Sequence, residues 1–330
     1  MDSLSQLVLG AACAAACAPS ETRRAAVWVG AALGTLPDLD IIPLSLLDLN
    51  PVEQMTWHRA ASHSLFLLPA FGWLLWLALK HFWTPVRQAP RAWFWGIQLA
   101  LITHPLLDAA TIYGTQLAWP LRPSPVMTGS LFIIDPLYTL PLLTACVITA
   151  CNRSRRAVVV GLALSTAYLG WSLAAQAHVQ RLAGRDLAAL HLSDAPRFVT
   201  PTPFNTLLWR VVAMTPEGFV EGYHSLIADR KPIQFHAYSS DIAALATIAE
   251  APDVRELRWF NRGFMKAEAR DGLIVLSDLR MGAEPNYVFR FAVARSDGAR
   301  GWTPITPEAA AWPSVGSRLA GVWTRLWNEP

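Results

Sequence analysis

Six apolar stretches of helical length occupy the first half of the chain and restrict its possible folds more than any other feature. They cover residues 4–19, 25–37, 64–82, 92–112, 130–150 and 157–177. A helix needs about 20 apolar residues to cross the hydrocarbon core of a bilayer, and most of these stretches approach that length. We therefore predict an α-helical polytopic membrane bundle of about six transmembrane or re-entrant helices. Because the first two are short and rich in Ala and Gly, we expect them to be tilted, partly re-entrant or closely packed through small side chains.

Charged residues are distributed unevenly and divide the chain into two regions. Of the 330 residues, 53% are hydrophobic and 15% are charged, which is too apolar for an ordinary soluble domain. Residues 1–180 contain 10 Lys and Arg and 8 Asp and Glu, whereas residues 181–330 contain 17 and 16. We therefore expect a transmembrane domain over residues 1–180 and a smaller extramembrane α+β domain, mainly antiparallel β, over residues 181–330.

Short β-branched or aromatic runs in the second half predict the antiparallel sheet. They are separated by Gly, Asp and Pro turns and cover residues 207–214, 219–227, 273–279 and 287–294. A helix is expected over residues 241–250, and the Pro-containing segment 200–203 is expected to mark the domain boundary.

The charge of the connecting loops predicts the orientation in the membrane. Lys and Arg gather in three loops, at residues 21–24, 80–91 and 151–156. By the positive-inside rule these loops face the cytoplasm. Residues on the outer face are then 38–63, 114–129 and everything after about residue 178. We expect a multi-pass protein of the bacterial inner membrane with its C-terminal domain on the periplasmic side.

Seven ionisable side chains lie at the ends of the apolar stretches, where charge is costly. They are Asp38, Asp40, His58, His63, His104, Asp108 and Asp135. His104 and Asp108 are four residues apart and therefore share a helix face. The predicted topology brings all seven to the outer ends of their helices, and the loop-charge argument did not use them. We therefore expect one site at that face, and the predicted periplasmic location applies to it as well.

Imidazole and carboxylate groups in this combination are typical of a divalent-metal site. They suit Zn²⁺ first, with Mn²⁺, Fe²⁺ or Mg²⁺ as alternatives, and seven ligands are enough for two ions. Arg59 is expected to hold a phosphate or carboxylate, and Ser62 to act as a supporting donor. Two other interpretations stay open: His104 and Asp108 as an interhelical hydrogen-bonded pair, and Asp135 as a helix breaker before Pro136.

Four short motifs resemble those of the YdjM-like membrane-bound metal-dependent hydrolases over residues 1–180. They read Met1-Asp2-Ser3-Leu4-Ser5-Gln6, Pro37-Asp38-Leu39-Asp40, His58-Arg59-Ala60-Ala61-Ser62-His63-Ser64 and His104-Pro105-Leu106-Leu107-Asp108. Gln6 stands where some members have a His, and Ala60 stands where a Gly is usual. The resemblance implies a metal-dependent hydrolase and leaves its substrate open.

We expect hydrolysis of a phosphoester or acyl bond by metal-activated water, on a lipid or lipid-linked substrate at the outer membrane face. The alternative is a non-catalytic metal-binding protein or a metal-ion transporter, although a transport site would favour the bilayer midplane. The net charge of +3 and the lack of a recognisable nucleic-acid motif argue against nucleic-acid binding. The expected partners are the lipid bilayer and the substrate, and the sequence leaves the oligomeric state unknown.

Overall fold

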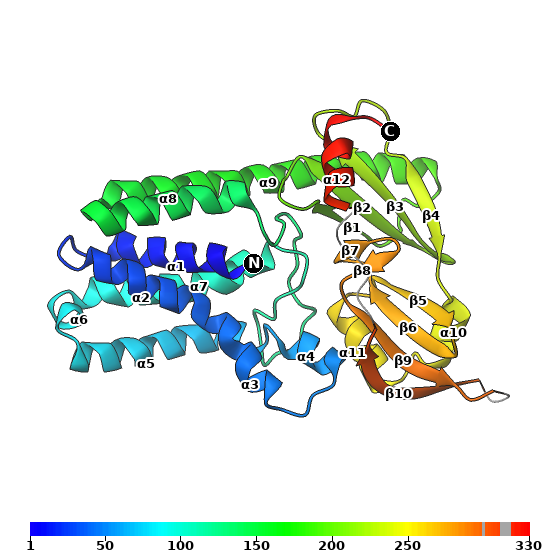
Figure 1. Cartoon of the computed structure of the whole chain (residues 1–330), viewed down its shortest axis with the longest axis horizontal. Coiled ribbons are helices and arrows are strands. Elements are labelled where there is room, and N and C mark those ends of the chain that lie inside the picture. Colours follow the sequence, from blue (N-terminus) through cyan, green and yellow to red (C-terminus); the bar gives the residue numbers. More distant parts are fainter. Residues whose placement is uncertain (299–300, 311–317) are drawn as a thin grey trace. The chain divides into compact units, whose positions relative to one another are not determined.

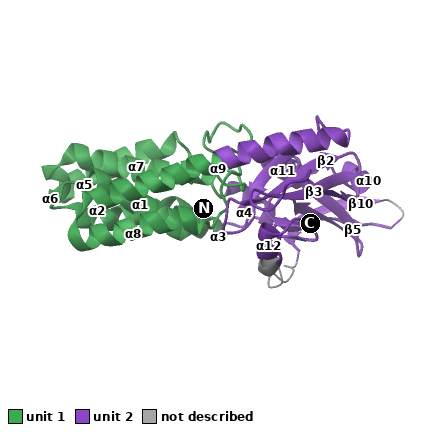
Figure 2. Cartoon of the chain, turned by 90° about the horizontal axis from the view of Figure 1, so that it is seen from above, with its two compact units in different colours: residues 1–44, 58–173 green, residues 45–57, 174–330 purple. Residues whose placement is uncertain are grey.

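The computed structural model describes residues 1–298, 301–310 and 318–330. The chain divides into two compact units, which Figure 2 shows in different colours. We call them the helical unit, formed by Met1–Leu44 and His58–Leu173, and the sheet unit, formed by Ser45–Trp57 and Ala174–Pro330.

All six predicted apolar stretches form helices in the structure (Figure 1). The helices are α1 (Ser3–Cys17), α2 (Arg23–Thr35), α5 (Leu67–Phe82), α7 (Pro90–Ala109), α8 (Pro136–Asn152) and α9 (Arg155–Ala189). Shorter helical elements connect them, namely η1 (Leu36–Asp40), α3 (Ile41–Ser45), α4 (Pro51–Trp57), η2 (Ala61–His63) and α6 (Thr84–Gln88). The last 16 residues of α9 belong to the sheet unit.

The structure does not support six membrane-spanning helices. By length and composition, two helical segments of the described chain are able to cross a membrane, Arg23–Ser45 and Arg155–Ala189, or three if one bent helix pair is counted as a single span. The physical reason differs among the other helices. With 15 residues, α1 is about 22 Å long, which is shorter than a bilayer core of about 30 Å. Although α7 has 20 residues, it includes Arg91, Gln98, His104 and Asp108.

Glycines let α1 and α2 approach very closely. A Cβ atom at Gly30 would lie 2.3 Å from the carbonyl oxygen of Gly10, and a Cβ atom at Gly34 would lie 2.3 Å from the carbonyl oxygen of Gln6. Neither contact is sterically possible, so these positions require glycine. Close packing through small residues, one of the three expectations for this helix pair, is therefore confirmed.

The sheet unit contains two four-stranded antiparallel sheets. The first has the order β1-β2-β3-β4, with β1 (Arg197–Pro201), β2 (Leu208–Thr215), β3 (Gly218–Ser225) and β4 (Phe235–Ser239). The second has the order β10-β9-β6-β5, with β5 (Met265–Arg270), β6 (Leu273–Asp278), β9 (Arg290–Ser296) and β10 (Trp302–Ala309). The remaining elements are a small ribbon of β7 (Gly282–Ala283) and β8 (Asn286–Tyr287), and the helices α10 (Ile242–Thr247), α11 (Pro252–Phe260) and α12 (Arg318–Trp327).

The C-terminal part of α9 covers one face of the first sheet. Ala175, Val179 and Ala183 of this helix pack in one buried cluster with Trp209 and Val211 of β2. The four predicted strand runs correspond to β2, β3, β6 and β9, so the antiparallel sheet is confirmed. The expected boundary at residues 200–203 is not a linker, because β1 ends at Pro201 and pairs with β2.

Candidate metal centre

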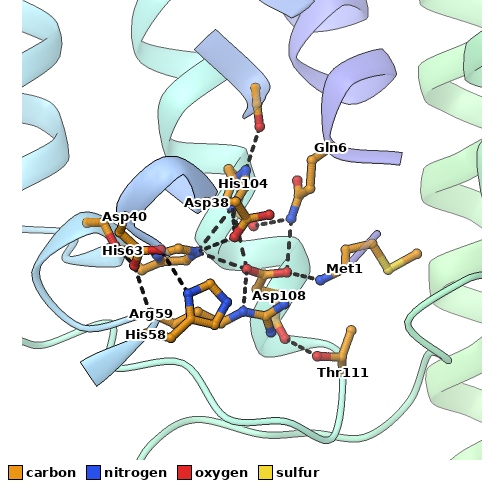
Figure 3. A network of polar contacts seen from close by, with 12 residues as sticks. Met1, Gln6, Asp38, Asp40, His58, Arg59, His63, His104, Asp108 and Thr111 are labelled. Carbon is orange, nitrogen blue, oxygen red and sulfur yellow. Dashed lines mark hydrogen bonds and ion pairs between the residues drawn. The ribbon is translucent and has the colours of Figure 1, made fainter. Parts of the chain in front are cut away.

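Four of the seven predicted ligands meet in one group in the helical unit (Figure 3). They are Asp38, His63, His104 and Asp108, and one ligand atom from each lies within 4.8 Å of the other three. Asp38 is partly buried, whereas the other three are almost completely buried. No second group of three or more such residues occurs in the described ranges of the chain.

The local sequence explains how each side chain reaches the group. Asp38 follows Pro37 in η1, the 3-10 turn that continues α2. His63 is the last residue of the short turn η2. His104 and Asp108 occupy successive turns of α7, with His104 Nε2 3.5 Å from Asp108 Oδ2, as their shared helix face predicts.

Hydrogen bonds orient both imidazoles through Nδ1. His104 Nδ1 lies 2.6 Å from the carbonyl oxygen of Gly34, which only accepts, so Nδ1 carries the proton. Ser62 Oγ donates its one proton to Asp40 Oδ2 at 2.6 Å, and His63 Nδ1 therefore donates to Ser62 Oγ at 2.9 Å. In the neutral form of both rings, Nε2 then presents a lone pair to the centre. Metal-binding histidines are typically held in this way.

Five of the six separations between the ligand atoms are close to those around one tetrahedral ion. Ligand atoms about 2.0–2.2 Å from a zinc ion at the tetrahedral angle lie about 3.3–3.6 Å apart. The two imidazole Nε2 atoms, of His63 and His104, are 3.1 Å apart. His63 Nε2 is 3.4 Å from Asp38 Oδ1 and 3.0 Å from Asp108 Oδ2. His104 Nε2 is 3.3 Å from Asp38 Oδ1 and 3.5 Å from Asp108 Oδ2. The geometry therefore fits a single divalent ion.

The hydrogen bonding of the two carboxylates also fits a cation. Asp38 Oδ1 is buried and has no hydrogen-bond partner within the described residues. Asp108 Oδ1 accepts from the amino group of Met1 and, at 3.0 Å, from Gln6 Nε2, which leaves Oδ2 facing the two imidazoles. Lone pairs from four side chains thus converge on one point. Two protonated imidazoles 3.1 Å apart would repel each other, whereas one shared divalent ion satisfies all four.

The comparisons with known proteins identify the family of the chain. The family described as YdjM inner membrane protein matches residues 1–179, which is more than half of the chain. The chain belongs to the YdjM family. Neither a curated protein nor a solved structure matches it. The family name indicates an inner membrane protein, and the match covers all four residues of the metal-ligand group.

Two further residues of the family motifs, Asp40 and His58, form a pair beside the metal-ligand group rather than within it. His58 Nδ1 lies 2.8 Å from Asp40 Oδ1, and the His58 ring centroid is 6.0 Å from that of His63. The side chain of His58 is 21% exposed and that of Asp40 is 12% exposed, whereas His63 is completely buried. Asp40 and His58 are therefore less deeply buried than His63.

Arg59 lies against the metal-ligand group in an unusual backbone conformation. Its φ of 63° is in the left-handed region, which few residues other than Gly adopt. The guanidinium group packs over the ring of Tyr113 at 4.8 Å, and its Nε is 3.2 Å from Asp108 Oδ2. Nε and Nη1 are buried without a well-formed hydrogen bond to the described chain. These N–H groups are suited to an anionic oxygen.

Asp135 lies outside the group. Its Oδ1 caps the first turn of α8 by accepting from the backbone N–H groups of Leu137 and Tyr138, and its Oδ2 accepts from the Tyr168 hydroxyl at 2.9 Å. The structure thus gives this aspartate a capping position at the start of α8.

Two contacts in the YdjM-family site have only weak signals in the sequence. The carbonyl of Gly34, which orients His104, is a backbone group, and only the small-residue pattern of α2 indicates close packing there. The amide of Gln6, which donates to Asp108, is marked by the opening motif of the family and by its position in an otherwise apolar helix.

Proposed function

We propose that this protein is a membrane-bound metal-dependent hydrolase that cleaves a phosphoester or acyl bond of a lipid or lipid-linked substrate. The observation that carries the proposal is the group of four ligand atoms within 4.8 Å of one another, with the guanidinium group of Arg59 beside it. Membership of the YdjM inner membrane family supports a substrate that is reached from the bilayer.

The four ligands are suited to Zn²⁺, because imidazole nitrogens and carboxylate oxygens are both zinc ligands. Mn²⁺, Fe²⁺ and Mg²⁺ remain alternatives with oxygen-rich coordination. Four protein ligands fill a tetrahedron, so the proposal requires an ion held by Asp38, His63, His104 and Asp108 to take a fifth ligand. A water molecule in that position would have a lowered pKa and would supply hydroxide near neutral pH.

Arg59 is proposed to bind and orient the substrate. Its guanidinium group is held by the Tyr113 ring and by Asp108, so Nε and Nη1 have little freedom to move. Such preorganised donors stabilise negative charge that develops on a phosphoryl or acyl oxygen. A buried arginine also favours substrates with an anionic group next to the scissile bond.

His58 is proposed to move the proton. Asp40 accepts a hydrogen bond from His58 Nδ1 and so keeps the other ring nitrogen, Nε2, available as a base. His58 Nε2 takes a proton from the attacking water while the water oxygen bonds to the phosphorus or acyl carbon. It then returns the proton to the leaving oxygen as the ester bond breaks, and the ring ends neutral.

The proposed orientation places the metal centre on the periplasmic side. It rests on the Arg-rich loops at residues 21–24 and 151–156, which favour the cytoplasm. Cysteine labelling tests this orientation. Single cysteines are introduced into these loops in a variant that lacks the native cysteines, and a membrane-impermeant thiol reagent is then added. Labelling of these loops in intact spheroplasts would show that they face the periplasm and that the proposed orientation is wrong.

Metal analysis and activity measurements on the same preparations test the function. The parent is expected to hold about one ion per chain, and His63→Ala and Asp108→Ala to hold almost none. His58→Gln is expected to keep the ion but to lower kcat by about 10²–10⁴ against phospholipids or lipid pyrophosphates. His81→Gln is a matched control, because His81 is an exposed histidine at the end of α5.

Two results would contradict the proposal. A parent protein without stoichiometric metal would remove the metal centre itself. Metal bound by the parent and lost in His63→Ala, without hydrolysis of any lipid phosphate or ester, would favour the alternative of a non-catalytic metal-binding protein or a transporter.

A further inference from the structure

A polar pocket within the sheet unit lies between the C-terminal part of α9 and the end of β3. Its volume is about 510 Å³, which is within the range of small-molecule sites. Side chains of both signs line it, together with two histidines, His178 of α9 and His224 of β3. We call it the α9–β3 pocket. It shares no residue with the metal centre.

The two carboxylates of the α9–β3 pocket are already engaged by protein groups. Asp229 forms a two-point ion pair with Arg325, with Nη1 to Oδ1 at 2.8 Å and a second contact from Nη2 to Oδ2. It also accepts from the backbone N–H of Ser225 at 2.9 Å. Asp186 Oδ2 accepts from the backbone N–H of Ile233 at 2.8 Å. The charge of Asp229 is therefore compensated by Arg325, whereas Asp186 accepts one backbone hydrogen bond.

The cations of the pocket are much less engaged. Arg185 and Arg230 are exposed, and their guanidinium groups have no ion-pair partner in the part of the chain that the structure describes. Lys231 Nζ is 3.4 Å from Glu329 Oε2, but its side chain is 69% exposed, so this pair is weak. The pocket therefore presents an excess of positive charge to a ligand.

His224 adds a buried polar atom with nothing to bind. The residue is only 7% exposed, and its Nδ1 has no hydrogen-bond partner among residues 1–298, 301–310 and 318–330. The nearest carboxylate oxygen, Asp229 Oδ2, is 3.7 Å away, which is beyond hydrogen-bond distance. Burial lowers the pKa of His224, which favours the neutral ring. An unpaired polar atom at this depth is costly unless a ligand satisfies it.

We propose that the α9–β3 pocket binds a phosphate group, carried either by a small soluble molecule or by a lipid headgroup. Arg185, Arg230 and Lys231 supply the charge, and guanidinium groups bind phosphate oxygens in bidentate fashion. His224 supplies a buried hydrogen-bonding group. This inference is independent of the proposed hydrolase function, because it uses none of the residues of the metal centre.

Binding measurements on the full chain in detergent test the proposal. The protein is first stripped of metal with a chelator, so that phosphate does not bind at the metal centre. Inorganic phosphate, glycerol phosphate and short-chain phosphatidic acid are then titrated calorimetrically. The double variant Arg185→Gln/Arg230→Gln is expected to bind about 10- to 100-fold more weakly than the parent, because charged hydrogen bonds are lost. Both residues are exposed, so the variant is expected to fold.

Arg181→Gln is the matched control, since Arg181 is an exposed arginine on α9 that does not line the pocket. It is expected to bind all three probes as the parent does. Tighter binding of phosphatidic acid than of glycerol phosphate would support the lipid headgroup as the source, and equal binding would support a soluble phosphate. Equal affinity in the parent and the double variant would overturn the proposal, and so would the lack of saturable binding of any of the three probes.

Discussion

The helical unit and the sheet unit both bury charged side chains, but they compensate the charge in different ways. In the sheet unit, Arg210 of β2 and Glu221 of β3 are 3% and 5% exposed. Arg210 Nη2 donates to Glu221 Oε2 at 2.5 Å, and Nη1 donates to the carbonyl oxygen of Leu279 at 2.7 Å. The Tyr223 hydroxyl donates to the other oxygen of Glu221 at 2.7 Å. The cation is paired with an anion, although Arg210 Nε is buried without a hydrogen-bond partner in the described residues.

The metal centre of the helical unit is arranged differently. Asp38 Oδ1, Asp108 Oδ2 and the Nε2 atoms of His63 and His104 all present lone pairs to one another. Nothing in the described chain donates to Asp38 Oδ1. Comparison of the two units shows that burial of charge alone does not indicate a functional site. The distinguishing feature of the metal-ligand group is that four possible ligand atoms lie together, although Asp108 is also paired with the amino group of Met1 and with Arg59.

The largest effect is expected from breaking the Arg210 ion pair. Arg210→Met leaves Glu221 buried without its cation and is expected to lower the free energy of unfolding by about 3–5 kcal/mol. The double variant Arg210→Met/Glu221→Leu is expected to regain most of that loss, because no uncompensated charge remains. Chemical denaturation in detergent measures both values.

The exposed Arg270 of the same unit provides the control for this comparison. Its ion pair with Asp271 has both side chains more than 80% exposed, so Arg270→Met is expected to change the free energy of unfolding by less than about 1 kcal/mol. Metal content is expected to be unchanged in every one of these variants. Loss of metal from folded Arg210→Met protein would contradict the view that the Arg210–Glu221 pair affects stability and not metal binding.

A smaller effect is expected where the packing of α1 and α2 supports the metal centre. Gly34→Ala places a Cβ atom against the carbonyl oxygen of Gln6 and is expected to cost about 1–3 kcal/mol of stability. It also displaces the Gly34 carbonyl that orients His104, so metal occupancy is expected to fall. Gly170→Ala is the control, because a Cβ atom there would meet nothing within 4 Å. Full metal occupancy in Gly34→Ala would show that this carbonyl does not position His104.

The sequence predicts most of the local structure of both units, since that depends on short-range patterns. The apolar stretches form helices, and the spacing of four residues places His104 and Asp108 on one face of α7. The number of membrane spans was not predictable in this way. Apolar composition identifies a helix, but α1 is too short to cross a bilayer core by itself.

Two of the strands that the sequence did not predict, β5 and β10, have physical reasons for their weak signals. β5 has the sequence Met-Lys-Ala-Glu-Ala-Arg, which contains no β-branched or aromatic residue. β10 contains Pro304 and Pro307, which are tolerated because β10 is at the edge of its sheet. Both form strands because they pair with strands of stronger β propensity, β5 with β6 and β10 with β9.

The candidate site was predictable as a set of residues but not as a set of roles. Asp38, Asp40, His58 and His63 all looked alike as polar groups at the ends of apolar helices. Their separation into a metal-ligand group and an Asp40–His58 pair depends on backbone turns such as η1 and η2, whose relative positions are set by helix packing. Asp135 had the same sequence signal and caps α8 instead.

The smallest effect on stability, but a clear effect on the metal, is expected from Ser62→Ala. Ser62 connects Asp40 Oδ2 with His63 Nδ1, so its loss removes the group that fixes the proton of His63. The variant is expected to lose about 0.5–1.5 kcal/mol of stability and to bind metal about 10- to 100-fold more weakly. Competition with a chelator of known affinity measures the change. Ser172→Ala removes a buried hydroxyl that bonds only within α9, so it is expected to lose similar stability without weakening metal binding. If both variants bind metal equally well, the hydrogen bond to Ser62 does not hold His63 in its metal-binding form.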